Sequence, residues 1–277
     1  MEKYDWTDHY SKMTERNIGI ISFDEQELIR NTHIAIFGTG GMGGRIAEIL
    51  VRSGCEKIRI IDKDTYSLSN LSTQNITQND VNKKKVDVLE KKFIDINPDL
   101  ELKKYDLVDE TNISEILQNV QIACLSLDGP LASIIVAREC RKRKIPLIEA
   151  WSTPLLYAWW FTEDSIDYES CYKFNTREKS YSQIRKIPDF QQHFRDSIFN
   201  FLEAMPNIPD YYGYKINTME KMKKGELSLR SFAPFVYMTG SYIAFEIIFS
   251  GILHRKQKVI APAIISYDLI ASQIEKF

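Results

Sequence analysis

The chain has 277 residues, of which 44% are hydrophobic and 27% charged, and these ordinary globular proportions exclude a largely disordered protein. Its 36 basic and 38 acidic residues give a formal net charge of −2, which excludes a strong basic field for non-specific binding of nucleic acid. The N-terminus, MEKYDWTDHY, is polar and lacks the apolar core of a secretory signal, so we expect a cytoplasmic protein.

The first half of the chain alternates short apolar runs with amphipathic segments. The sequence SFDE at 22–25 is a capping-box signature and predicts a helix before the first strand. The pattern then predicts strands over 33–37, 57–62, 101–108, 122–127 and 146–151, with helices over 45–52, 82–97, 112–120 and 130–144. Such alternation is typical of βαβ units, and it predicts an α/β, Rossmann-like, largely parallel sheet with helices on both faces.

The pattern changes after residue 151. A strand is predicted over 157–162, only short helices are expected in the polar and aromatic stretch 163–232, and closing strands are predicted over 258–270. Residues 234–253 are apolar and long enough to cross a membrane, but Glu246 lies among them, which favours a buried helix at a subunit interface and no membrane. We therefore expect an N-terminal helical segment (1–32), a nucleotide-binding core (33–151) and a divergent C-terminal region for substrate binding and dimerisation (152–277).

A glycine-rich turn follows the first predicted strand. It matches GxGxxG and contains Gly38, Gly40, Gly41, Gly43 and Gly44. The backbone amides of such a turn, with the N-terminus of the next helix, bind phosphate. Asp62 ends the following strand 19 residues after Gly43, where a carboxylate suits ribose hydroxyls. The motif alone does not separate ATP from NAD, and a tight turn without a ligand would need the same glycines.

The residues after Asp62 resemble a known family. DKDTYSLSNLSTQN (62–75) is similar to the D-x-D…SNL-x-R-Q signature of the ThiF/MoeB/HesA family, the ubiquitin-activating-type adenylyltransferases. The resemblance continues through NKKKVD (82–87), INP (96–98) and CLSLDGP (124–130), and it includes YSKMTERNIG (10–19) and APFVYMTGSYIAFEII (233–248). It covers residues 10–150 well, 151–232 hardly and 233–270 loosely.

This resemblance implies an ATP-dependent homodimeric enzyme that joins a carboxylate to AMP and releases pyrophosphate. The implied catalytic residues are Lys85 at the phosphates, Arg16 entering from the partner subunit, and Asp128 as the Mg²⁺ ligand. The implied nucleotide-binding residues are Gly38, Gly40, Gly41, Gly43, Asp62, Asp64, Asn70, Gln74 and Lys85. The carboxylate would belong to a ubiquitin-like protein, a ribosomal peptide or a small acid. Taken singly, Lys85 could be a solvated residue at a helix start, Asp128 a helix cap, and Arg16 a surface residue.

Two departures from the signature qualify this interpretation. Thr73 stands where the family has an arginine, so Arg45, Lys63 or Arg16 supplies the missing charge, or the activity is altered. No CxxC pair is present, so we expect no structural zinc. Cys171, which has polar flanks, is either reactive or inert, and inert is favoured because no electropositive setting is evident. An NAD-dependent oxidoreductase and a non-catalytic nucleotide-binding relative are the alternative functions.

Overall fold

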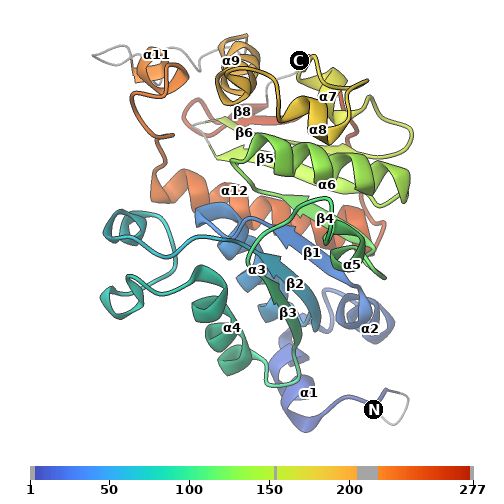
Figure 1. Ribbon diagram of the computed structural model, residues 1–277. Coiled ribbons are helices and arrows are strands. Elements are labelled where there is room, and N and C mark those ends of the chain that lie inside the picture. Colours follow the sequence, from blue (N-terminus) through green and yellow to red (C-terminus); the bar gives the residue numbers. More distant parts are fainter. Residues whose placement is uncertain (1–3, 153–154, 205–217, 275–277) are drawn as a thin grey trace.

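Five parallel strands form the first part of one eight-stranded sheet in the computed structural model, which describes residues 4–152, 155–204 and 218–274 (Figure 1). They are β1 (Ile34–Phe37), β2 (Lys57–Ile61), β3 (Glu101–Tyr105), β4 (Ile122–Leu125) and β5 (Leu147–Ser152). In the strand order β3-β2-β1-β4-β5, the chain adds β2 and β3 on one side of β1 and then adds β4 and β5 on the other side. The predicted Rossmann-like parallel sheet is confirmed.

Four helices connect these strands: α3 (Gly41–Arg52), α4 (Lys85–Ile96), α5 (Ile113–Ile116) and α6 (Pro130–Lys142). Four predicted boundaries were wrong by three residues or more, and one of them is the start of α3, which is Gly41 instead of residue 45. Asn82 (φ 68°) and Asn119 (φ 62°) adopt left-handed backbone conformations, so α4 begins after Asn82 and α5 is one turn instead of the expected 112–120. Residues 106–108 lie beyond the end of β3, which was predicted to continue to residue 108.

Antiparallel strands complete the sheet in the order β6 (Leu155–Phe161), β7 (Ile265–Asp268) and β8 (Gln273–Ile274). The strand predicted over 157–162 is therefore present. Of the closing strands predicted over 258–270, only residues 265–268 form a strand, and Ile260 makes an isolated bridge to Trp160.

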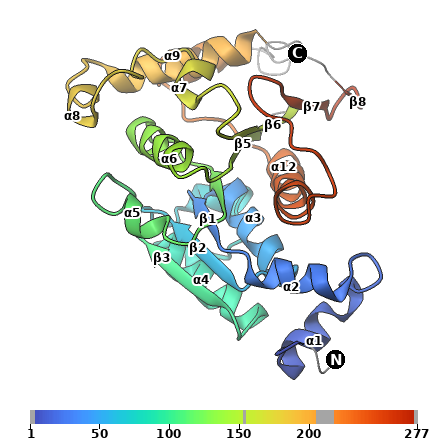
Figure 2. The ribbon, with the colours of Figure 1, turned by 90° about the vertical axis from the view of Figure 1, so that its right-hand side faces the viewer.

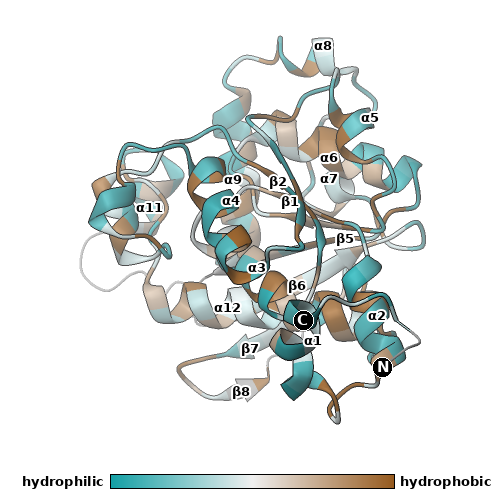
Figure 3. Ribbon diagram, turned by 90° about the horizontal axis from the view of Figure 1, so that it is seen from below, coloured by the Kyte–Doolittle hydropathy of each residue, from teal (hydrophilic) through white to brown (hydrophobic). Residues whose placement is uncertain are grey.

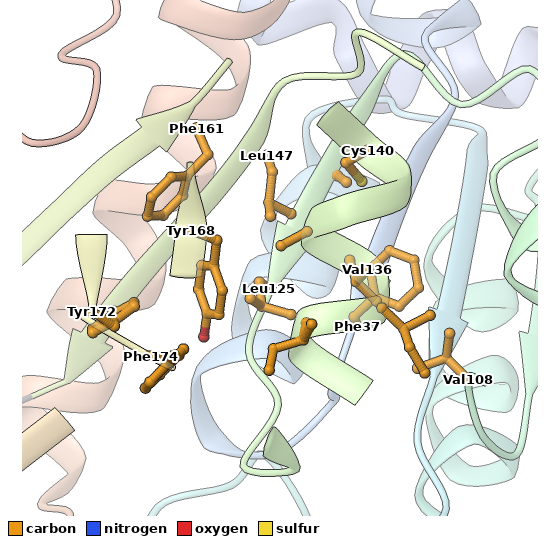
Figure 4. Packing of buried hydrophobic residues seen from close by; sticks show 14 of the residues in the cluster. Phe37, Val108, Leu125, Val136, Cys140, Leu147, Phe161, Tyr168, Tyr172 and Phe174 are labelled. Atoms are coloured by element: carbon orange, nitrogen blue, oxygen red, sulfur yellow. The ribbon is translucent and has the colours of Figure 1, made fainter. Parts of the chain in front are cut away.

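Helices cover both faces of the sheet (Figure 2). On one face, α3, α4 and the long helix α12 (Ala233–Glu246) pack with residues such as Ile46, Phe93 and Ile243. On the other face, α6 packs Val136 and Cys140 against Phe37, Leu125 and Leu147 of the strands (Figure 4). In Figure 3 brown hydrophobic segments recur along α3 and α6, whereas α1 is largely teal. The buried apolar residues of these helices pack on the strands in two clusters, one on each face of the sheet, as expected for a three-layer α/β fold.

The N-terminal segment packs at the C-terminal end of α3. It consists of α1 (Asp8–Thr14), the 3-10 turn η1 (Glu15–Asn17) and α2 (Phe23–Asn31), and the predicted capping box of Ser22 and Glu25 is present. The Tyr10 hydroxyl donates to the Gly54 carbonyl at 2.9 Å, and the Gln26 amide donates to the Ser53 carbonyl at 2.9 Å. Both acceptors follow the last turn of α3 directly.

The region 163–232 contains more helix than expected. Its helices are α7 (Tyr168–Cys171), α8 (Tyr181–Ile184), α9 (Phe190–Glu203) and α11 (Thr218–Lys223). The expectation of only short helices was wrong for α9, which has 14 residues and buries Phe194, Ile198 and Leu202 at a spacing of four. This spacing gives one apolar face, which packs against the α6 side of the sheet.

The helix predicted over 234–253 is α12 followed by the π-helical turn η4 (Ile247–Ile252). In the part of the chain that the structure describes, Ala233–Ile252 is one helix long and apolar enough to cross a membrane, but 61% of its apolar window is buried inside the protein. Glu246 is fully buried within it and forms an ion pair with Lys256 at 2.7 Å. The helix thus fits the predicted buried core element.

Candidate active site

The glycine-rich loop (residues 38–44) follows the carboxyl end of β1, next to the end of β4. The strand order reverses between these two strands, and open α/β sheets bind ligands at such a point. A Cβ atom on Gly38 would lie 2.2 Å from the Ser126 carbonyl oxygen, and a Cβ atom on Gly43 would lie 1.9 Å from the Gly38 carbonyl oxygen. Around Gly40, by contrast, only Gln74 Nε2 comes as near as 4.0 Å. The loop is therefore packed tightly at Gly38 and Gly43 and open at Gly40. Gly40 lies at the N-terminus of α3, where a phosphate would bind.

Asp62 fixes this loop. Its Oδ2 accepts hydrogen bonds from the Thr39 backbone amide at 2.7 Å and the Thr39 hydroxyl at 3.1 Å, and its Oδ1 accepts from the Asp64 amide at 2.9 Å. Sequence reasoning assigned Asp62 to the ribose and missed Thr39. The signal was the hydroxyl residue directly after the first glycine of the motif.

Lys85 is held beside the same carboxylates. As the first residue of α4 it directs its ammonium to Asp64 at 3.0 Å and to Asp62 at 3.8 Å. Its side chain is only 9% exposed, whereas Lys83 and Lys84 are exposed. The alternative of a solvated helix start is therefore wrong for Lys85, because its ammonium is buried and paired with two carboxylates.

Asp128 follows β4 and completes a group that we call the Asp128 cluster, namely Asp62, Asp64, Lys85 and Asp128. Solvent reaches its side chain, yet the protein around it removes enough water to raise the pKa of its carboxyl group. The Lys85 ammonium lowers this pKa, while the Asp64 and Asp62 carboxylates raise it. The alternative role as a helix cap is wrong, because the N-cap position of α6 is occupied by Gly129 and not by Asp128.

The two predicted polar contacts in the loop after Asp62 differ. The Asn70 side-chain oxygen accepts from the Ser67 amide at 2.9 Å and stabilises its own turn, η2 (Leu68–Ser72). Gln74 lies over Gly40, and its side-chain oxygen is buried without a hydrogen-bond partner among the described residues. An orphaned buried oxygen indicates a missing partner, so Gln74 fits a ligand contact better than Asn70 does.

Arg16 does not join these residues within one chain. It is exposed on η1, in the segment that packs at the C-terminal end of α3. The 12 residues of α3 span about 18 Å, and the glycine-rich loop lies at the opposite end of that helix. An Arg16 side chain that reaches a nucleotide site must therefore reach that of another chain.

The charges at the site are unbalanced. The Asp128 cluster contains three carboxylates and one ammonium, so a polyphosphate requires further cations there. Mg²⁺ fits this setting, since it needs only one or two carboxylates and takes its other ligands from phosphates and water. Across the described ranges, no group of three or more His, Cys, Asp or Glu side chains is placed to hold a metal by itself. Asp128 would therefore hold the ion together with the substrate.

The cysteines lie outside the site. Cys55, Cys124 and Cys140 are buried, and Cys171 is half-buried on α7. Burial raises the pKa of the Cys171 thiol to about 12, and the carboxylates of Glu149 and Asp167 add to the shift. A thiol with so high a pKa is protonated at neutral pH, which supports the inert interpretation.

Several known proteins are similar to this chain in sequence. The tRNA threonylcarbamoyladenosine dehydratase of Bacillus subtilis is 32% identical over 138 residues, which are 49% of this chain and 54% of that protein. The molybdopterin-synthase adenylyltransferase of Haemophilus influenzae is 29% identical over 130 residues, 46% of this chain and 54% of that protein. The chain thus spans about half the length of each of these relatives.

Solved structures share the fold over nearly the whole chain. Escherichia coli MccB with MccA-N7isoASN aligns with a TM-score of 0.67 at 20% identity and covers 98% of this chain and 72% of that one. PaaA aligns with a TM-score of 0.69 at 16% identity and covers 98% of this chain and 74% of that one. The profile of the ThiF family matches residues 14–277. The chain therefore belongs to the ThiF family.

Proposed function

We propose that the protein is an ATP-dependent adenylyltransferase that activates a carboxylate as an acyl-adenylate. The observation that carries this proposal is the Asp128 cluster beside the open face of Gly40, because an NAD-binding turn would account for Gly40 and Asp62 but not for a buried Lys85 and an Asp128 of raised pKa. In the reaction a carboxylate oxygen attacks the α-phosphorus of ATP, and the bond from that phosphorus to the β-phosphate oxygen breaks.

The residues of the site divide the work. The backbone amides of the glycine-rich loop and the N-terminus of α3 bind phosphate oxygens. The Lys85 ammonium offsets negative charge as the two anions approach, which is the largest electrostatic obstacle to this reaction. Magnesium held by Asp128 would neutralise phosphate charge. Asp62 keeps the loop in place by accepting hydrogen bonds from the backbone amide and the hydroxyl group of Thr39.

For the substrate we propose the C-terminal carboxylate of a peptide or protein. Support comes from the fold, since MccB was solved with the peptide-derived ligand MccA-N7isoASN and matches this chain through the C-terminal region as well. A relative of the ubiquitin-like modifier-activating enzyme 5 type, 30% identical over 129 residues, supports the same substrate class. The net charge of −2 favours this class over tRNA.

Calorimetry and pyrophosphate exchange test the activity. Mg·ATP should bind with micromolar to millimolar affinity and NAD far more weakly. A candidate peptide should then stimulate exchange of labelled pyrophosphate into ATP. Preference for NAD would reject the proposal in favour of an oxidoreductase, and ATP binding without exchange for any carboxylate would favour the non-catalytic relative.

We further propose a homodimer in the cytoplasm, in which Arg16 enters the partner's site. Exposed apolar side chains support such an interface. They are Met238 and Phe245 on α12, Phe232 just before that helix, and Ile20 near Arg16 in sequence. The four free cysteines support a reducing compartment.

A mixing experiment tests the shared site. Arg16→Ala and Asp128→Ala should each be nearly inactive, whereas a mixture that has exchanged subunits should recover up to about a quarter of wild-type activity, because about half the dimers are mixed and each has one intact site. A mixture that stays inactive after verified exchange would show that Arg16 does not act between subunits.

A further inference from the structure

Thr73 leaves the phosphate site one cation short. It is 7% exposed, and its carbonyl oxygen and Cβ lie 3.3 and 3.8 Å from the position that a Cβ atom of Gly41 would occupy. Thr73 therefore lies directly against the glycine-rich loop without a charge. A polyphosphate bound above this loop needs a positive group on the same side.

Arg45 lies on that side of the loop. It follows Gly41 by four residues on α3, so the two share one helix face, which packs against α12. The Arg45 guanidinium lies 4.0 Å from the ring centre of Tyr237, and the neighbouring Val236 has a methyl group 2.9 Å from the Cβ position of Gly41. Arg45 and Thr73 thus flank the same glycine.

The α12 helix makes room for this side chain. A Cβ atom on Gly240 would lie 2.9 Å from Arg45 Cγ and 3.1 Å from Arg45 Cβ, so a larger residue there would displace Arg45. The aliphatic part of Arg45 occupies that gap. Its guanidinium is thereby held between α3 and α12, beside Tyr237 and Glu48.

Arg45 shares its ion-pair partner, Glu48, with a second arginine. Arg45 Nη1 lies 3.3 Å from Glu48 Oε2, while Arg52 binds Oε1 of the same carboxylate at 2.9 Å and Asn75 donates to Oε2. Two guanidinium groups therefore share one carboxylate, which leaves one positive charge in excess. The Arg45 Nε is also buried without a hydrogen-bond partner among the described residues. A phosphate that attracts Arg45 would leave Glu48 paired with Arg52.

The other two candidate cations lie elsewhere. Lys63 is exposed just after β2, and its charge acts on Asp128. Arg16 lies at the far end of α3 in its own chain and would enter the site only from a partner, so it is not a cation that this chain itself places beside Thr73. We propose that Arg45 binds the β- and γ-phosphates of ATP in this protein, in place of the arginine that the related signature has at position 73. This inference rests on the proposed use of ATP.

Affinity for ATP and for AMP, measured by calorimetry, tests the inference. Arg45→Gln should weaken ATP binding about 10- to 100-fold, the usual effect of losing a charged hydrogen bond. AMP, which lacks the β- and γ-phosphates, should bind within about twofold of wild type, and Arg45→Lys should be intermediate for ATP. The matched control Arg143→Gln, which removes an arginine at the C-terminal end of α6 that pairs with Glu139, should change neither affinity.

Equal losses for ATP and AMP in Arg45→Gln would assign Arg45 a structural role and overturn the inference, as would an unchanged affinity for ATP. A wild-type protein that binds AMP and NAD but no ATP would overturn the proposed function itself, and the inference with it. Thermal unfolding shows whether each variant is folded. If Arg45→Gln does not fold, the affinities of Arg45→Lys decide: a loss for ATP that is larger than the loss for AMP supports the inference, and equal losses overturn it.

Discussion

Two carboxyl groups, one after β4 and one on the neighbouring strand β5, both have a raised pKa, but solvent reaches only the first. The Asp128 cluster follows β2 and β4 at the open edge of the sheet. In the second, which we call the Glu149 cluster, Glu149 of β5 accepts hydrogen bonds from the hydroxyl groups of Tyr172 at 2.6 Å and Tyr168 at 3.2 Å. Glu149 is 4% exposed, and its burial raises its pKa to about 8.

The difference lies in what surrounds each carboxyl group. Glu149 has two hydroxyl donors, and Trp151 donates to Tyr172 at 2.9 Å, so the cluster is satisfied by the protein itself and joins α7 to the sheet. In Figure 4, Tyr168 and Tyr172 pack in the same core as Leu147. Asp128 has no such donors among the residues that the structure describes, and it remains open to solvent. A raised pKa thus indicates a reaction site only where a ligand can reach it.

Removing Asp128 should produce the largest functional change. Asp128→Ala should lower substrate-dependent pyrophosphate exchange by about a hundredfold or more. Its thermal stability should be unchanged or higher, because the folded protein disfavours this ionised carboxylate. The control Asp106→Ala removes an exposed aspartate paired with Lys84 and should retain activity. Exchange near the wild-type rate in Asp128→Ala would remove this residue from the mechanism.

The Glu149 cluster should respond in the opposite sense. Glu149→Leu leaves two buried tyrosine hydroxyl groups without their acceptor, so the free energy of unfolding should fall by about 3 kcal/mol in urea titrations. Glu149→Gln keeps an acceptor and should lose less. Both variants should keep the exchange activity per folded molecule. A selective loss of activity in the stable Gln variant would mean that the two clusters are coupled.

The pH dependence of stability should separate the same two variants more finely. Because the pKa of Glu149 is about 8 when folded and 4.5 ordinarily, its contribution to stability is complete below pH 4.5 and is lost as the pH rises through 8. Between pH 5 and 9 the wild type should lose on the order of 4 kcal/mol more stability than Glu149→Gln. Parallel pH profiles of the two proteins would show that Glu149 is ionised throughout.

The smallest change is expected at Cys171. Its thiol is half-buried near Glu149, which helps to raise its pKa. Cys171→Ser should retain exchange activity within about twofold, and the wild-type thiol should react slowly with iodoacetamide at neutral pH. Rapid alkylation that also stops transfer of the acyl group would identify Cys171 as reactive.

Sequence reasoning worked well where the determinants are local. The order of strands and helices through residue 151 follows from short apolar runs and glycine turns, and Gly38, Asp62 and Lys85 are fixed by motifs that include their neighbours. The exact helix ends did not follow, because Asn82 and Asn119 take left-handed conformations that propensity alone does not specify.

Contacts between distant segments could not be predicted. The tyrosines that hold Glu149 lie 19 and 23 residues farther along the chain, in a segment without a recognisable motif. A glutamate within an apolar strand was the one available signal, since a buried carboxyl group needs donors. In α9, Phe190 and Phe201 add aromatic residues around the regular apolar face and obscure its period.

The uneven packing of the glycine-rich loop has a genetic consequence. An alanine methyl group at position 43 would collide with the Gly38 carbonyl, so alleles there should fail through loss of the folded protein. Gly40 has open space and a φ of −64°, which any residue adopts, so Gly40→Ala should accumulate normally. Its methyl group would meet an obstacle only when a nucleotide arrives. A screen for protein abundance would therefore find the first allele and overlook the second, which selection for activity alone would reveal.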